Sequence, residues 1–330
     1  MTTTAVEGII DKENMEPIAK KSKSETPAKC TQAHPGAAVY AAALDGLKLD
    51  DPVAAFFDFC REREQIRHRR ESGAPAPWSE DPIFQRGRFL NVFREDDRAT
   101  KSILRFLEPV AKKGDESALL EAIFFARWCN RDSTLDAVSP ELLGNPEALK
   151  HALEALESPP WCNETAYPVG AVQWEGVTYS RLEAATTLFG RIAPFLSRAV
   201  KEAQGDVHRA TQAVNKEFGM ENDFPIFMAV MDIAWFRPDL IVPASLVPTG
   251  IGAVAFINRL QQHLGLDTHD EVLLKMCELQ ATHWPEAKRP FQPIDIEYLC
   301  CECRKYYSYV NGTKTFEGKN VFIPGKSPNL

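Results

Sequence analysis

The sequence predicts an all-α protein, and three observations lead to that prediction. Apolar residues recur every three or four positions through most of the chain beyond residue 50, which is the spacing of one helix face. Strand signals are few, and strands do not alternate with helices. The 330 residues are 44% hydrophobic and 25% charged, as in ordinary globular proteins. A mainly helical domain with one or two small β-hairpins is therefore expected.

The first helix is expected to begin at Asp51-Pro52, a capping acid followed by a proline suited to the first helical position. Residues 72–82, rich in Gly and Pro, should end it. The same reasoning predicts helices over residues 87–112, 116–131, 147–157, 181–203, 206–218, 224–236, 252–264, 269–281 and 294–309. Hairpins are expected over residues 169–179, turning at Glu175-Gly176, and over residues 316–323.

Three parts are expected along the chain. Residues 1–50 should form a disordered tail and lead-in, because the first 36 are rich in Lys, Glu, Thr, Ser and Pro. Residues 51–312 form the helical domain, and residues 313–330 form a short tail or hairpin. No secretory signal or membrane span is recognisable, and residues 20–23 offer a weak nuclear import signal. The prediction is an intracellular protein, nuclear or cytoplasmic, with no membrane partner.

The charge is unevenly distributed. The chain carries a net charge of −8, yet residues 60–131 hold 15 Lys and Arg against 12 Asp and Glu. Five arginines crowd residues 61–70, at positions 61, 63, 67, 69 and 70. A salt-bridged helix face is one interpretation, because Glu62 and Glu64 lie among them. A phosphate-contacting edge is the other.

No cofactor or metal ion is predicted. Gly325-Lys326-Ser327 is similar to the end of a phosphate-binding loop, but Asn320 stands where the first glycine belongs and no strand precedes it. The chain therefore has no kinase P-loop. Cys300, Cys301 and Cys303 cannot all face one tetrahedral ion from a helix, so buried thiols are expected.

Residues 88–100, RFLNVFREDDRAT, form an unusual segment. On a helix they would place an apolar face opposite a polar ridge that holds Asn91, Arg94, Asp97 or Arg98, and Lys101. This segment resembles a motif of the 5-hydroxymethyluracil DNA kinase helical domain. That family is related to the alpha-glutamyl/putrescinyl thymine pyrophosphorylases of DNA hypermodification.

Further segments resemble the same family in the same order, over residues 55–310. They are the Arg127–Asn130 element, the turn with Tyr167, the Phe227–Asp232 element, Gly250 and Gly252 with Arg259, and the Glu297–Tyr306 element with Glu302 and Lys305. Three positions depart from the pattern: Ile233 replaces a leucine, Ile251 a proline and Phe256 a glycine.

The resemblance implies a helical fold similar to DNA glycosylases and a role on DNA that carries modified thymine. In the family's proposed chemistry, a kinase phosphorylates the hydroxymethyl group of 5-hydroxymethyluracil. A partner protein then displaces phosphate or pyrophosphate with an amine. The implied partners are DNA, modified or single-stranded, and a separately encoded nucleotide kinase.

Such a displacement needs cations at the leaving group and a carboxylate that accepts a proton. Asp97, Asp232 and Arg94 are the candidate catalytic residues. Cations that contact phosphate and amides that read a base edge suit the other positions. The candidate substrate- or DNA-binding residues are Arg88, Asn91, Arg98, Arg127, Asn130, Tyr167, Gly250, Gly252, Arg259, Glu302 and Lys305.

Each candidate also has a structural interpretation. Asp232 lies in an apolar helix, where a buried arginine would pair with it, and Arg127 could reach either carboxylate. Arg94 and Asp97 could form an i,i+3 pair, as could Glu302 and Lys305. The Gly250-x-Gly252 turn could bind phosphate at a helix start, or could simply need a positive φ.

Three functions remain open. The chain could be an enzyme that modifies or removes a hypermodified thymine, which requires Asp97, Asp232 and Arg94 to meet in one pocket. It could be a non-catalytic DNA-binding module that works with a separate kinase, which requires only a basic face. It could be a helical scaffold without nucleic-acid binding, in which the polar ridge is internally salt-bridged and no cleft exists.

Overall fold

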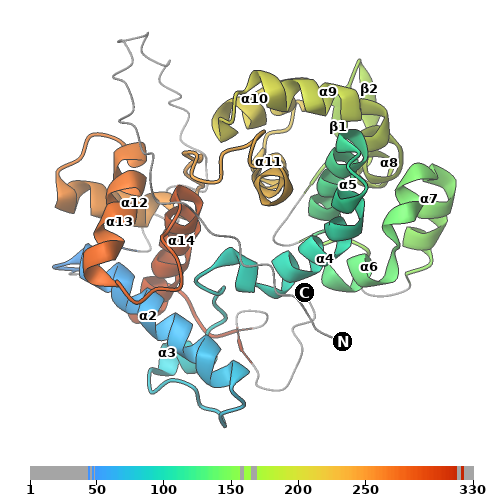
Figure 1. Cartoon of the computed structure of the whole chain (residues 1–330). Helices are drawn as coiled ribbons and strands as arrows, with labels where there is room; N and C mark the ends of the chain where they lie inside the picture. The colour runs from blue at the N-terminus through green and yellow to red at the C-terminus, as the bar shows by residue number, and fades with distance from the viewer. Residues whose placement is uncertain are drawn as a thin grey trace, which may run out of the picture. The chain divides into compact units, whose positions relative to one another are not determined.

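A computed structural model describes residues 44, 47, 49–156, 160–164, 169–317 and 321–322. It confirms the mainly helical prediction, with one two-stranded antiparallel sheet in the described part (Figure 1). Most of the N-terminal tail, the basic residues 20–23, Tyr167 and the segment 325–327 lie outside the described residues. No described helix is long and apolar enough to cross a membrane.

The elements are α2 (Pro52–Glu71), α3 (Pro82–Arg86), η1 (Arg94–Asp96), α4 (Arg98–Lys112), α5 (Glu116–Cys129), α6 (Asp132–Ala137), η2 (Pro140–Gly144), α7 (Pro146–Glu154), β1 (Val172–Trp174), β2 (Val177–Tyr179), α8 (Arg181–Glu183), the π-helical turn η3 (Ala184–Leu188), α9 (Phe189–Glu202), α10 (Val207–Phe218), α11 (Phe224–Phe236), α12 (Val254–Leu264), α13 (His269–His283) and α14 (Pro293–Val310).

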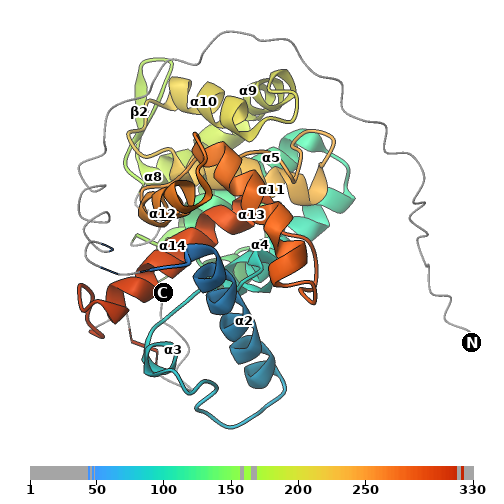
Figure 2. The same ribbon diagram turned by 90° about the vertical axis from the view of Figure 1, so that its left-hand side faces the viewer.

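Two sets of helices pack among themselves. In the first, α14 contacts α2, α3, α12 and α13, and Figure 2 shows α2 beside α14. In the second, α5 contacts α4, α9 and α11, and Figure 1 shows α11 between α5 and α10. Residues 122–129 of α5 are all buried, so this helix forms the centre of the second set.

Local sequence signals explain most element boundaries. The Asp51 carboxylate accepts hydrogen bonds from the Val53 and Ala54 N–H groups, which caps α2 as predicted. The first predicted hairpin is confirmed, because β1 pairs with β2 in the register Val172↔Tyr179. Glu175 and Gly176 both have positive φ at its turn. The second predicted hairpin lies partly outside the described residues, and within them Val321 pairs with Gly87.

The predicted helix over residues 87–112 is wrong in its first part. Only α4 is helical there, and residues 87–97 are irregular apart from η1. The reason is tertiary: Arg63 donates to the carbonyls of Phe89 and Leu90, and the Tyr298 hydroxyl donates to the Asn91 carbonyl at 2.9 Å. Carbonyls that a helix would use internally are held by side chains of α2 and α14. The predicted continuous polar ridge therefore does not form.

Candidate functional site

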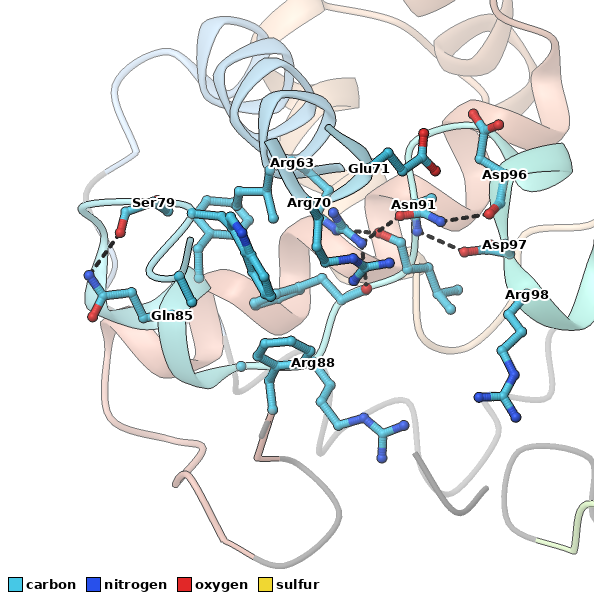
Figure 3. A pocket seen from close by; sticks show the side chains of 18 of the residues that line it. Arg63, Arg70, Glu71, Ser79, Gln85, Arg88, Asn91, Asp96, Asp97 and Arg98 are labelled. Carbon is cyan, nitrogen blue, oxygen red and sulfur yellow. Dashed lines mark hydrogen bonds between the residues drawn. The ribbon is translucent and has the colours of Figure 1, made fainter. Parts of the chain in front are cut away.

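A pocket of about 970 Å³ opens beside α2 and the irregular segment 87–91 (Figure 3). It is walled by α2, the loop that follows it, α3 and the start of α4. Its lining residues are Arg63, Ile66, Arg70, Glu71, Ala76, Pro77, Trp78, Ser79, Phe84, Gln85, Arg86, Gly87, Arg88, Phe89, Leu90, Asn91, Asp96, Asp97, Arg98, Ala99, Lys101, Arg105 and Phe322.

Positive charge dominates this lining. The lining contains seven cationic side chains and only three carboxylates, although the whole chain carries a net charge of −8. The cations are Arg63, Arg70, Arg86, Arg88, Arg98, Lys101 and Arg105. Such an excess attracts phosphate groups. We call this site the cation-rich pocket.

Internal carboxylates only partly neutralise these cations. Arg98 pairs with Asp132, and Arg105 Nη2 lies 3.0 Å from Asp136 Oδ1. Because Arg98 and Arg105 are exposed, these pairs are weak and can exchange for a ligand. The Arg70 side chain is exposed and forms no hydrogen bond or ion pair within the described part of the chain.

Aromatic side chains form the apolar wall of the pocket. The Trp78 and Phe322 ring centroids are 5.8 Å apart, and those of Phe84 and Phe89 are 5.3 Å apart. Cations beside aromatic surface match the two halves of a nucleotide, its phosphate and its base.

Asn91 organises the base of the pocket. Its Oδ1 accepts from Arg63 Nη2 at 2.6 Å, and its Nδ2 donates to the Asp96 carbonyl at 2.8 Å (Figure 3). Its backbone N–H donates to Asp97 Oδ1 at 2.8 Å. Both ends of the amide are thus engaged within the protein, so Asn91 positions the pocket wall. Reading a base edge would require these bonds to break.

Asp97 also lines the pocket, and its carboxyl group holds a proton more tightly than usual. The residue is half-buried, and burial of its carboxylate raises the pKa to about 7. The Asn91 N–H and the charges of Arg63 and Arg94 act in the opposite direction, and Glu302 adds to the increase. A carboxyl group with this pKa can accept or donate a proton at neutral pH.

Asp232 lies elsewhere, in a buried ionic cluster. Its carboxylate accepts from Arg127 Nη2 at 2.8 Å and from Arg94 Nη2 at 3.2 Å. Arg127 also donates to Asn130 Oδ1 at 3.2 Å. None of these four residues lines the cation-rich pocket. The structural interpretation of Asp232 is confirmed. Arg94 pairs with Asp232 of α11, so the alternative i,i+3 pair of Arg94 with Asp97 is not the one that forms.

The glycine turn before α12 packs against α14. The Gly250 N–H donates to Glu297 Oε1 at 2.8 Å, and the Gly252 carbonyl accepts from Arg304 Nε at 3.1 Å. Neither glycine has a positive φ, so that structural explanation is wrong. A Cβ added to Gly252 would lie 2.6 Å from Cys301 Sγ. These glycines allow close approach to α14, and the Gly250 N–H is already occupied.

The remaining candidate residues either make structural contacts or line the pocket. Glu302 accepts the Leu90 N–H at 3.0 Å and pairs with Lys305 at 2.6 Å, which confirms the predicted helix pair. Arg259 donates to the Leu44 carbonyl at 2.9 Å. Arg88 and Arg98 do line the pocket, so of the predicted residues it gathers Arg88, Asn91, Asp97 and Arg98.

Some arginines of the basic stretch of α2 form the predicted salt-bridged face, and others line the pocket. Arg61, Arg67 and Arg69 pair with Asp58, Glu64 and Glu62, respectively, which is the predicted salt-bridged face. Arg63 and Arg70 line the pocket instead.

Sequence reasoning missed several lining residues. Arg63 and Arg70 were not singled out from their cluster, although their spacing of seven places them on one helix face. Arg86 and Arg105 belong to α3 and α4, and Trp78 to a loop, so their convergence depends on tertiary structure. Cys300 and Cys303 are buried thiols as expected, and Cys301 is partly buried. No metal-binding group of three or more His, Cys, Asp or Glu occurs among the described residues.

Comparison with known proteins identifies a family that the chain matches. Residues 51–314 match the model of a family described as "5-hmdU DNA kinase, helical domain". The matched range contains every motif on which the resemblance was based. No curated protein and no solved structure matches the chain.

Proposed function

Because the chain belongs to the family of the 5-hmdU DNA kinase helical domain, we propose that it binds DNA carrying 5-hydroxymethyluracil or its phosphorylated form in the cation-rich pocket. The observation that carries this proposal is the excess of seven cations over three carboxylates in one pocket of an acidic chain. Neutralising DNA phosphates with Lys and Arg releases counterions, and this release drives binding.

The pocket suits a nucleotide that has left the duplex stack. The rings of Trp78, Phe84 and Phe89 provide surface against which a base can pack, beside cations for its phosphate. A base within a duplex cannot reach such a wall, so the DNA must be single-stranded there or the nucleotide must flip out. Single-stranded or flipped modified DNA is the proposed ligand.

A pure scaffold role fits less well. It predicts an internally salt-bridged ridge without a cleft, whereas the pocket exists and Arg70 has no carboxylate partner among the described residues. The non-catalytic module needs only the cationic pocket, and it would present DNA to a kinase.

Asp97 favours a second candidate function, transfer of an amine to the modified base or other processing of it. Its carboxyl lines the pocket and has a pKa of about 7, so it can accept a proton from an attacking amine at neutral pH. Asp232 and Arg94 are not part of this proposal, because their charges are paired with each other away from the pocket.

Fluorescence anisotropy tests DNA binding. Labelled single strands would carry thymine, 5-hydroxymethyluracil or its phosphorylated form, at low and at physiological salt. Lys101→Gln and Arg105→Gln should each weaken binding. Each should also reduce the slope of log K against log salt concentration by about 0.7 per lost phosphate contact, the value for single strands. Arg209→Gln, an exposed arginine of α10 outside the pocket, is the matched control.

Absence of binding at low salt would contradict the proposed function. Mass spectrometry of the base after incubation with an amine separates the two candidates. If the chain is an enzyme, Asp97→Asn should bind DNA normally but yield no product. If it is a module, wild type should yield none either.

A further inference from the structure

Arg63 has an unusual environment for a buried cation. The residue belongs to α2 and is only 5% exposed. Nε donates to the Leu90 carbonyl at 2.8 Å, and Nη2 donates to Asn91 Oδ1 at 2.6 Å. Nη1, however, has no hydrogen-bond partner among the described residues. A buried cationic N–H without a partner is unfavourable, because it has lost its hydrogen bonds to water. An acceptor on a ligand would satisfy it.

No carboxylate forms an ion pair with Arg63 in the described part of the chain. Asp97, Glu302 and Glu64 act on it only at longer range. Glu302 is already paired with Lys305, and Glu64 with Arg67. Burial and the nearby charge of Arg70 lower the pKa of Arg63 to about 10. The positive charge at the base of the pocket is therefore incompletely balanced.

Arg70 adds a second cation at the same place. It follows Arg63 by seven residues on α2, and their guanidinium groups lie close together in Figure 3. Arg70 is exposed and unpaired within the described residues, so it can move to contact a ligand. Two like charges held together favour an anion between them.

We propose that Arg63 and Arg70 form an oxyanion site at the base of the cation-rich pocket, and that this site takes a terminal phosphate, a phosphate monoester. The burial of Arg63 selects against a diester, because an internal phosphate carries two substituents that keep it away from a buried donor. A monoester presents three acceptor oxygens and a charge near −2. The inference deepens the proposed function by naming the group that the pocket recognises.

Two sources on DNA share this chemistry: a 5′-terminal phosphate and a phosphorylated hydroxymethyl group on a base. The test compares four 3′-labelled single strands of one sequence at physiological salt. One has a 5′-hydroxyl and one a 5′-phosphate; the other two have a 5′-hydroxyl with either 5-hydroxymethyluracil or its phosphate ester inside. Inorganic phosphate, measured by calorimetry, is the free-anion arm.

We expect at least one phosphorylated strand to bind about tenfold more tightly than its matched unphosphorylated strand, as one added charge-assisted contact allows. Arg70→Gln should remove that preference while keeping residual DNA binding. Arg209→Gln, the exposed arginine of α10 outside the pocket, should retain it. Arg63→Lys keeps the charge but loses the fork and should also remove the preference, provided that its melting temperature is unchanged.

Which strand shows the preference identifies the source. Salt-sensitive binding of all four strands with equal affinity would overturn this inference and leave the proposed function intact. An equal loss for all strands in Arg70→Gln would overturn it too. If no strand binds, the proposed function fails, and phosphate binding that disappears in Arg70→Gln would still support the oxyanion site.

Discussion

Arg127 of α5 donates to both carboxylate oxygens of Asp232 on α11, with Nη2 2.8 Å from Oδ1. Arg94 of η1 reaches the same carboxylate at 3.2 Å. One buried carboxylate thus joins three elements that are well separated in sequence, η1, α5 and α11. Both arginines are buried, and Asp232 is fully buried. The cluster holds the segment that leads into α4.

Asp232→Asn should therefore destabilise the fold. It leaves two buried guanidinium groups without their carboxylate, which typically lowers the free energy of unfolding by about 3–5 kcal/mol. Chemical denaturation measures this change. Asp239→Asn, which removes an exposed partner of Arg237, is the control and should lower the free energy of unfolding far less. A small effect of Asp232→Asn would show that the cluster does not hold the fold.

Asp97→Asn should raise the free energy of unfolding relative to wild type, and this gain should grow as the pH rises. The pKa of Asp97 is raised from 3.8 to about 7, so the folded protein retains a proton that the unfolded chain loses. Stability from this group is present at acidic pH and is lost as the pH rises toward 7. Relative to wild type, the variant should gain roughly 1–2 kcal/mol between pH 5 and pH 8, discounted for partial exposure.

Urea unfolding at the two pH values measures this gain. Asp270→Asn, at an exposed position of α13, is the control and should show little change across the range. A gain of the same size at both pH values would contradict the raised pKa of Asp97.

Gly252→Ala should overlap with α14. The added Cβ would lie 2.6 Å from Cys301 Sγ, and such overpacking costs about 1–3 kcal/mol. Thermal unfolding of Gly252→Ala, Cys301→Ala and the double variant forms a cycle. The alanine at 252 should cost less when Cys301 is also alanine. An unchanged cost would place the strain elsewhere.

Tyr298→Phe should loosen the pocket wall. The hydroxyl donates to the carbonyls of Asn91 and Val92, and losing a buried donor leaves acceptors unsatisfied at about 1–3 kcal/mol. Hydrogen exchange of residues 88–97 should accelerate, and DNA binding should weaken. Tyr307→Phe is the control, because its hydroxyl makes no hydrogen bond among the described residues. Equal exchange in both variants would contradict this role of Tyr298.

The sequence indicated only part of the pocket lining, because most of its residues come together through tertiary contacts. Arg88, Asn91, Asp97 and Arg98 were expected near one another because they are neighbours in the chain, and they line one pocket. One hypothesis required Asp232 to join them, whereas the alternative paired it with a buried arginine; Arg127 and Arg94 hold it in a separate buried cluster. Arg63 lies about 30 residues away in sequence, and no periodic pattern indicates which backbone carbonyls its side chain reaches.

The sequence by itself determined the helices with apolar faces and clear caps, the turn at Glu175-Gly176 and the family, because these depend on local spacing and on motif order. Only the tertiary structure decided the conformation of residues 87–97, where Arg63 and Tyr298 take the carbonyls that a helix needs. It also decided which arginines are paired and which line the pocket. Hydrogen bonds between distant residues outweigh the small free energy of local helix preference, so those features follow from packing alone.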